Sequence, residues 1–160
     1  MIFIVQFELH MLKVKGTMTI CFVYKHEEMN RLMEKIESMR ATSAMGSYSH
    51  GIVSGNQVFL SGQLGIDPDT GKLADGIENQ MRYAFKNVLY ILEERSLNFS
   101  NVVKTTVLLS DMSDFQKVNE IYAEQFSEPY PARTTYAVNE LPLNALVEIE
   151  VIAELENEQL

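Results

Sequence analysis

Hydrophobic residues recur at helical spacing over residues 77–94, which predicts the longest helix of the chain. Spacings of three and four residues place the apolar side chains on one face, formed by Ile77, Met81, Ala84, Val88 and Ile91. Asp75 stands just before this stretch and is a candidate N-cap, because its side chain can accept a hydrogen bond from the first turn. We expect the helix to end near Ser96.

A second helix is predicted to start at residue 113. Ser113 and Gln116 have the spacing of a capping box, in which two side chains satisfy free backbone N–H groups reciprocally. The stretch that follows carries an apolar stripe with which the helix can pack, formed by Phe115, Val118, Tyr122 and Phe126.

Runs rich in β-branched and aromatic residues predict strands. Ile52–Ser54 and Gln57–Leu60 flank the pair Gly55-Asn56, which is typical of a hairpin because glycine supplies the positive φ of the turn. Asp67–Gly71 is predicted to be a further turn, with Pro fixing one angle and Gly permitting another. Three later strands are expected at Val102–Leu109, Thr134–Val138 and Leu146–Ala153. The first of these is apolar on both faces, as in a central, covered strand.

This order of elements predicts a mixed sheet with two helices packed on one face, the layered arrangement of an α+β protein. The other face of the sheet keeps apolar residues that need cover, and we expect an oligomer to supply it. The predicted elements all fall in residues 33–160, which we expect to form one domain.

Residues 1–32 form an N-terminal extension of uncertain role. Met29, Met33 and Met39 are alternative starts, so the extension is either an accessory or a mis-assigned beginning. In the alternative interpretation, Thr17–Tyr24 adds an edge strand to the sheet, because it is rich in β-branched and aromatic residues.

Charge argues against a nucleic-acid partner. The chain has a net charge of −9, and residues 33–160 alone carry −10, whereas phosphate backbones bind clustered Lys and Arg. The single cysteine, Cys21, excludes a disulfide within the chain, and the three scattered histidines lack the spacing of a zinc site. No apolar run reaches the roughly 18 residues of a membrane span, and no signal-peptide pattern occurs. We therefore expect a cytoplasmic protein without a membrane or metal site.

Arg133 is the first candidate for chemistry, and it lies where a loop becomes a predicted strand. A guanidinium presents a planar fork of N–H donors that matches a carboxylate with two charge-assisted hydrogen bonds. The alternative is a surface arginine or a structural ion pair, since most arginines are exposed.

Glu148 is the second candidate. Strand alternation places Glu148 and Glu150 on the face opposite Val147, Ile149 and Val151. The alternative is a half-solvated strand with two surface acids. If a neighbouring subunit covers this face, a buried carboxylate tends to hold its proton and can serve as acid or base.

Two glycine-containing segments are weaker candidates. Gly46–Gly51 contains Tyr48 and His50, and the alternative is a flexible turn with an exposed tyrosine and a surface histidine. Ser61 and Gly62 follow a strand, where the glycine would let backbone N–H groups approach a ligand closely. The chain has no nucleophile elbow, P-loop or dinucleotide-binding glycine motif.

Taken together, motifs over about residues 35–154 resemble the Rid (reactive intermediate deaminase, YjgF-type) family. They follow the family order and comprise Gly46–Ser49, Gly55–Gln63, Asp67–Gly71, Asn87-Val88, Ile91–Glu93, Val102–Val107, Asp111–Phe115, Val118–Tyr122, Tyr130–Arg133 and Val147–Ala153. Each motif alone could arise by chance, but the ordered set is specific.

The resemblance implies a chorismate-mutase-like α+β protomer and a homotrimer with three clefts between subunits, without a metal or a bound cofactor. It implies a 2-iminobutanoate/2-iminopropanoate deaminase that hydrolyses enamines and imines to 2-keto acids and ammonia. Such substrates, 2-aminoacrylate and 2-aminocrotonate among them, are released by pyridoxal-phosphate enzymes.

The resemblance also implies roles for residues. Arg133 matches the residue that binds the substrate carboxylate, and Glu148 matches the acid that places or activates water. Thr135 occupies the position whose backbone meets the substrate or water, where many deaminating members have Cys, so we expect altered specificity. Tyr48 matches a further cleft residue, and we expect it to be catalytic with Arg133 and Glu148, while Ser61, Gly62 and Asn119 match substrate-binding positions.

Two rival functions remain open. One is a non-catalytic trimer that binds small keto acids or shields other proteins as a holdase, and it predicts binding without turnover. The other is a metal-independent endoribonuclease, an activity attributed to some relatives, against which the acidic charge counts.

Overall fold

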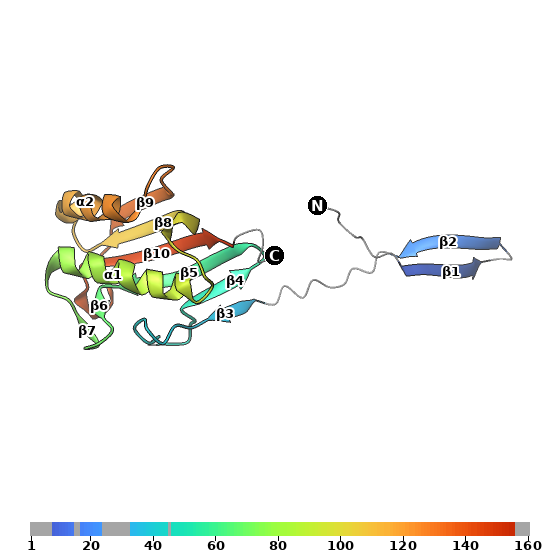
Figure 1. Cartoon of the computed structure of the whole chain (residues 1–160), viewed down its shortest axis with the longest axis horizontal. Helices are drawn as coiled ribbons and strands as arrows, with labels where there is room; N and C mark the ends of the chain where they lie inside the picture. The colour runs from blue at the N-terminus through green and yellow to red at the C-terminus, as the bar shows by residue number, and fades with distance from the viewer. Residues whose placement is uncertain (1–7, 15–16, 24–32, 45, 156–160) are drawn as a thin grey trace. The chain divides into compact units, whose positions relative to one another are not determined.

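The chain divides into two compact units, Met1–Leu32 and Met33–Leu160, in the computed structural model shown in Figure 1. The structure describes residues 8–14, 17–23, 33–44 and 46–155. In the first unit, β1 (Glu8–Val14) and β2 (Thr17–Val23) pair antiparallel in a two-stranded sheet. The strand suggested at Thr17–Tyr24 thus pairs with β1, while the large sheet contains strands of the second unit alone; Tyr24 lies outside the described residues. That residues 1–32 are an accessory or a mis-assigned beginning stays a prediction.

The second unit is built on a six-stranded mixed sheet, in which β8 and β9 are parallel and the other neighbours are antiparallel. In spatial order the strands are β3 (Glu34–Ile36), β4 (Gly51–Ser54), β5 (Gln57–Leu64), β10 (Val147–Glu154), β8 (Val102–Leu109) and β9 (Ala132–Ala137). A small separate hairpin is formed by β6 (Ile66–Asp67) and β7 (Lys72–Leu73).

The predicted hairpin is confirmed. Ser54 of β4 pairs with Gln57 of β5. Gly55 in the turn has a φ of 67°, a backbone conformation that would be strained in a residue with a side chain. The predicted turn Asp67–Gly71 also forms, because the Gly71 amide donates to the Asp67 carbonyl at 2.8 Å.

The first predicted helix is confirmed as α1 (Gly76–Glu93), and its apolar stripe is buried. Asp75 occupies the predicted N-cap position, although its side chain makes no capping hydrogen bond. At the other end, the Leu97 amide donates to the Leu92 carbonyl and Ser96 takes a φ of 56°, which closes the helix as expected near Ser96.

The second predicted helix is α2 (Phe115–Gln125), but its expected capping box does not form. A short 3-10 helix (η2, Met112–Asp114) precedes α2, and the Asp111 carboxylate accepts a hydrogen bond from the Ser113 amide at 2.8 Å. This local acceptor places Ser113 inside a turn, where its hydroxyl cannot cap α2. Two further short 3-10 helices are η1 (Phe99–Asn101) and η3 (Pro142–Asn144).

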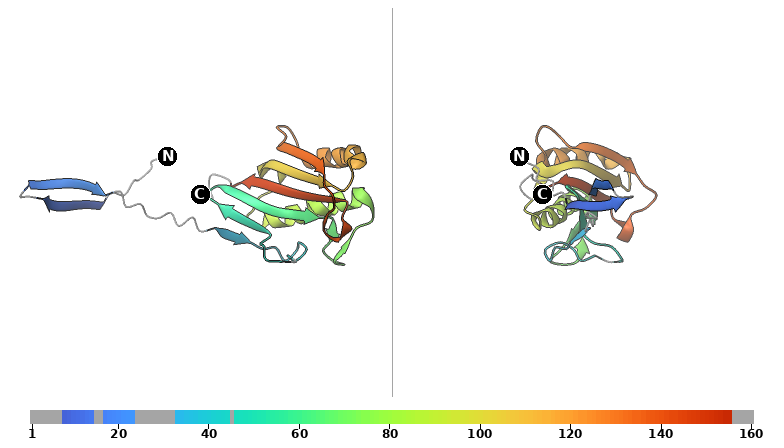
Figure 2. Two further views of the ribbon diagram at one scale, coloured as in Figure 1. Left: turned by 180° about the vertical axis from the view of Figure 1, so that it is seen from behind. Right: turned by 90° about the vertical axis from the view of Figure 1, so that its right-hand side faces the viewer.

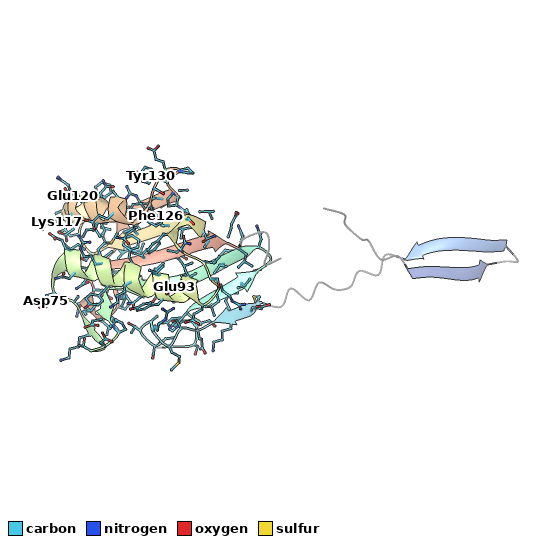
Figure 3. All side chains as sticks on the ribbon, viewed as in Figure 1. Asp75, Glu93, Lys117, Glu120, Phe126 and Tyr130 are labelled. Atoms are coloured by element: carbon cyan, nitrogen blue, oxygen red, sulfur yellow. The ribbon has the colours of Figure 1, made fainter. Side chains whose placement is uncertain are left out.

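Both helices cover the same face of the sheet, as predicted, and α1 packs on β5 and β10 (Figure 1). The core between the layers is apolar, and its aromatic end contains Phe85, Phe99, Tyr122 and Phe126. Figure 3 shows Lys117 and Glu120 on the exposed side of α2. The α+β fold predicted from the sequence is confirmed.

The opposite face of the sheet has no covering element among the described residues of the second unit (Figure 2, left). Strand pairing aligns Ile52, Phe59 and Ile152 in one row across this face, and Phe59 keeps 39% of its surface exposed. We call this side the open face.

Candidate functional site

Arg133 is the second residue of β9, an edge strand of the large sheet. It pairs with Thr105 of the parallel neighbour β8, and paired residues point to the same side of a sheet. Thr105 is fully buried beneath α2, so Arg133 lies on the helix-covered side. Because β9 begins at Ala132, Arg133 also lies where a loop becomes a strand, as predicted.

The Arg133 guanidinium rests in a cradle made by α2. Its Nη2 donates to Asn119 Oδ1 at 2.8 Å, and its central carbon lies 4.4 Å from the Tyr122 ring centre and 5.7 Å from that of Phe115. Phe115, Asn119 and Tyr122 are spaced by four and three residues, so one face of α2 presents all three. Within the described ranges, no carboxylate forms an ion pair with Arg133. The cradle holds a cation whose charge no acid of that part of the chain neutralises.

Thr135 follows two positions after Arg133 on β9 and lies on the same side of the strand. Its Oγ1 is buried and has no hydrogen-bond partner among the described residues. A buried hydroxyl without a partner costs free energy, so a partner supplied from outside the protomer would be favourable. The structure thus brings Arg133, Asn119 and Thr135 together.

Glu148 lies on the open face of β10, between the buried residues Val147 and Ile149. The alternation predicted for this strand is confirmed. Burial raises the pKa of the Glu148 carboxyl, and the nearby charge of Glu150 raises it further. The Glu148 carboxyl occupies the space beside Gly62, where an added Cβ would come well within 3.0 Å of the carboxylate. Glycine at position 62 therefore leaves the room that Glu148 fills.

A β-bulge lies at Ser61 and Gly62. On β10 only Glu150 separates Ile149 from Val151, whereas on β5 two residues separate their partners, Gln63 and Leu60. The Gln63 side chain donates to the carbonyls of Ser61 and Gly62 at 3.0 and 3.2 Å and so holds the bulge. Such bulges are common beside active sites because they redirect side chains.

Ser61 connects this bulge to the segment that carries Tyr48. Its Oγ donates to the Ser49 carbonyl at 2.7 Å, and its amide donates to the His50 carbonyl at 3.0 Å. Tyr48 is about half exposed, at 49%, and lines a hollow of about 30 Å³ with Gly62. The structure thus brings Tyr48, Ser61, Gly62 and Glu148 into a second group.

The two groups are separate within one protomer. Arg133 points to the helix-covered side of β9, Glu148 points to the open face of β10, and β8 lies between these strands. We call them the arginine half-site (Arg133, Asn119, Thr135) and the glutamate half-site (Tyr48, Ser61, Gly62, Glu148). A single chain cannot apply both to one small ligand.

His50 is buried, which corrects the sequence-based interpretation of a surface histidine. Its Nδ1 accepts a hydrogen bond from the Ser38 amide at 3.1 Å, and its Nε2 lies 2.9 Å from the Thr42 carbonyl. These partners assign the proton to Nε2. His50 therefore ties residues 38–42 to β4 as a structural residue.

Sequence reasoning gave no site role to Tyr122 or Gln63. Tyr122 was interpreted as part of an apolar stripe, although its spacing of three from Asn119 and its polar tip could have indicated a shared task. Gln63 is a buried polar residue directly after Gly62, a combination that could have pointed to a bulge.

Within residues 8–14, 17–23, 33–44 and 46–155, no cluster of three or more His, Cys, Asp or Glu could hold a metal ion. Over the same ranges, no helix is both long and apolar enough to cross a membrane. The expectations of a metal-free, cofactor-free site and of a cytoplasmic location stay predictions.

Comparisons with known proteins agree on one family. The family profile described as Endoribonuclease L-PSP (Ribonuc_L-PSP) matches residues 38–155. Reactive Intermediate Deaminase A, chloroplastic, of Arabidopsis thaliana is 49% identical over 123 residues, which cover 76% of this chain and 66% of the relative. A 2-iminobutanoate/2-iminopropanoate deaminase of Homo sapiens is 42% identical over 119 residues, covering 74% of this chain and 87% of the relative.

A solved structure supports the same assignment. E. coli TdcF with bound serine superposes with a TM-score of 0.73 at 36% identity, covering 77% of this chain and 99% of that structure. The fold, the family profile and the curated relatives therefore agree on one family. The residues matched by the profile, 38–155, include both half-sites.

Proposed function

The chain belongs to the Endoribonuclease L-PSP (Ribonuc_L-PSP) family, and from this premise we propose that it is a 2-iminobutanoate/2-iminopropanoate deaminase. The resemblance to Rid proteins is confirmed, and curated relatives named as reactive-intermediate or imine deaminases support an enzyme that acts on imines. The substrates proposed are 2-aminoacrylate, 2-aminocrotonate and their imine tautomers, released by pyridoxal-phosphate enzymes.

The proposed reaction needs a proton transfer and a water molecule. The enamine gains a proton on the carbon next to the nitrogen-bearing carbon, loses one from nitrogen, and becomes an imine. Water then adds to the C=N carbon, both of its protons pass in turn to nitrogen, and ammonia leaves as the C=O bond of the keto acid forms. The protein has to hold the substrate, place the water and exchange protons, so no metal or covalent intermediate is required.

The observation that carries the proposal is the arginine half-site. Its guanidinium is held by Asn119 and two aromatic rings, yet forms no ion pair with an acid of the described residues. Such a group can bind a substrate carboxylate through its in-plane N–H donors. The related structure of TdcF contains bound serine, a small molecule that also has a carboxylate. Fixing the carboxylate would fix the reacting carbon next to it.

We assign the chemical steps to the glutamate half-site. Burial raises the pKa of the Glu148 carboxyl above its ordinary value, which makes this group a better proton acceptor and donor for the reaction than an exposed carboxylate. In our proposal Glu148 orients the attacking water, Tyr48 closes the cleft, and Ser61 and Gly62 line it. Asn119 and Thr135 line the opposite wall beside Arg133.

We propose a homotrimer that joins the arginine half-site of one protomer to the glutamate half-site of the next. Two features support it. The half-sites point to different sides of one sheet, and the open face exposes apolar residues such as Phe59 that a partner would bury. Cover of the open face would also desolvate Glu148 further.

The function is tested with a pyridoxal-phosphate dehydratase that makes 2-aminoacrylate from serine, in an excess that leaves imine hydrolysis limiting. Adding the protein is expected to raise the rate of pyruvate release in proportion to its concentration. Threonine as precursor tests the four-carbon substrate in the same way. A rate equal to that without the protein, together with measurable pyruvate binding, would instead favour the non-catalytic binding function.

The second candidate, an endoribonuclease, has the family description in its favour. The net charge of −10 over residues 33–160 opposes it, because a polyanion is repelled by an acidic surface. An RNA substrate incubated in parallel is expected to stay intact.

Glu148→Gln is expected to slow the reaction and, at neutral pH, to stabilise the fold. The raised pKa means that the folded state holds this proton more tightly than the unfolded chain does. Stability from this group is therefore complete below the ordinary pKa of about 4.3 and declines as the pH rises through the raised value. Glutamine carries no charge, so the stability of the variant does not decline in this way as the pH rises. Its kcat is expected to fall about tenfold or more, because glutamine cannot donate or accept the proton.

Urea unfolding midpoints at pH 7 and pH 4, with kinetics at pH 7, check this prediction. The Glu148→Gln midpoint is expected above wild type at pH 7 and equal to it at pH 4. Glu154→Gln is the matched control, because Glu154 lies on the same strand and face but is exposed. Equal kinetics for Glu148→Gln and wild type would remove Glu148 from the mechanism.

A further inference from the structure

We propose that Tyr122 is a positioning residue that orients the Arg133 guanidinium for the substrate carboxylate. The inference rests on the proposed function and adds to it a residue that does not itself touch the substrate. It is carried by a chain of contacts that runs from α2 through Tyr122 to the two parallel strands β8 and β9.

The Tyr122 ring lies beneath the guanidinium and is itself immobilised. Its centre is 4.4 Å from the central carbon of Arg133, and the residue is only 5% exposed. Its hydroxyl is 2.8 Å from Oγ1 of Thr105, a fully buried residue. Thr105 in turn pairs with Arg133 across the two strands. Both ends of the Tyr122 side chain are thus fixed with respect to the strand that carries Arg133.

The chemistry of the contact suits a binding site. A guanidinium stacked on a ring uses its flat face, whereas its N–H donors point outward in the plane. The ring attracts the cation without neutralising its charge, unlike a carboxylate partner. Asn119 takes one N–H of Nη2 and fixes the rotation of the plane. The ring contact and the single hydrogen bond to Asn119 leave other N–H donors of Arg133 for a ligand carboxylate.

Tyr122 also stays uncharged in this position. Burial raises the pKa of its phenol, an effect that the Thr105 hydrogen bond and the Arg133 charge only partly oppose. A phenolate would compete with the substrate for Arg133, and the apolar surroundings prevent it. The hydroxyl therefore serves as an anchor for the ring and not as an acid or base.

The test compares two substitutions of Tyr122 in the full chain, using the dehydratase assay and direct binding of pyruvate. Tyr122→Leu removes the ring and is expected to raise KM and the pyruvate Kd about five- to thirtyfold, the range of a cation–π contact. The effect on kcat is expected to be smaller than the effect on KM. Tyr122→Phe loses the hydroxyl anchor but keeps the ring, which the buried surroundings still hold, and should restore both constants to within about twofold of wild type.

Two controls separate positioning from general damage to the core. Ile121→Ala creates a cavity on the same helix, at a buried residue that has no described contact with Arg133, and it should lower stability without raising KM. In an Arg133→Ala background, Tyr122→Leu should no longer change the pyruvate Kd, because the two residues act through one contact.

Each outcome decides something. An unchanged KM and Kd in Tyr122→Leu, or an equal rise in Ile121→Ala, overturns the positioning role while leaving the proposed function intact. If the wild type shows no turnover but binds pyruvate, the deaminase function fails, and the binding series still tests Tyr122. A wild type that neither turns over nor binds pyruvate overturns both.

Discussion

Arg133→Ala is expected to lower kcat/KM for imine hydrolysis by about 100- to 1000-fold, the loss expected for two charge-assisted hydrogen bonds. Arg133 would hold the substrate by its carboxylate, and without it the reacting carbon is no longer fixed beside the water. The dehydratase assay measures the loss as keto-acid release above the uncatalysed rate. Arg133→Lys should recover only part of the activity, because an ammonium lacks the planar fork.

Arg82→Ala is the matched control. Arg82 on α1 is paired with Glu124 on α2 at the exposed surface, and exposed pairs contribute little to stability. The variant removes the same charge and a similar volume at a position outside both half-sites. If Arg133→Ala keeps the wild-type rate, or if Arg82→Ala loses as much, carboxylate binding by Arg133 is refuted.

Long periodic elements were predictable from sequence, and short ones were not. The apolar stripe of α1 repeats over 18 residues, and β8 was predicted with its observed bounds because its β-rich composition is continuous. In contrast, β3 has three residues and β6 and β7 have two each, too few to show a period. They exist because non-local partners pair with them, β4 in the case of β3. The wrong capping box has a local cause, since Asp111 supplies an acceptor earlier in the chain.

The candidate residues were accessible from the family motifs, but their arrangement was not. Alternation along β10 correctly separated Glu148 from the core residues. The face of the sheet on which Arg133 lies depends on its pairing with Thr105. This pairing between two strands cannot be read from a single sequence. The division into two half-sites therefore emerged only from the sheet. The role of Tyr122 was hidden for a similar reason, because an aromatic residue in an apolar stripe is expected to be core.

Close packing at the end of β5 keeps the glutamate half-site in place. The Asn87 side chain donates to the carbonyls of Leu64 and Ile66 at 3.2 and 2.9 Å, which ties this strand end to α1. Gln80 of α1 donates to the Ala74 carbonyl at 3.0 Å and accepts from the Leu146 amide at 2.8 Å. Hydrogen bonds therefore join α1 to the residues on both sides of Gly65. Gly65 directly follows β5, the strand that carries Gly62.

Gly65→Ala is expected to destabilise the fold by about 3 kcal/mol, at the upper end of the usual cost of overpacking. A Cβ at position 65 would come well within 3.0 Å of the backbone of Gln80, which lies inside α1 and cannot move aside cheaply, since the Gln80 side chain also ties the helix to Ala74 and Leu146. Urea unfolding at fixed protein concentration measures the effect, and the midpoint should fall by about 1–3 M.

Gly62→Ala is the informative contrast, because its Cβ would meet only the end of the Glu148 side chain, which can swing away. It should leave the unfolding midpoint much closer to wild type than Gly65→Ala does, yet lower kcat by displacing the carboxyl. A midpoint shift for Gly65→Ala no larger than that for Gly62→Ala would show that α1 can retreat from the strand. The tight junction would then not be what fixes the glutamate half-site.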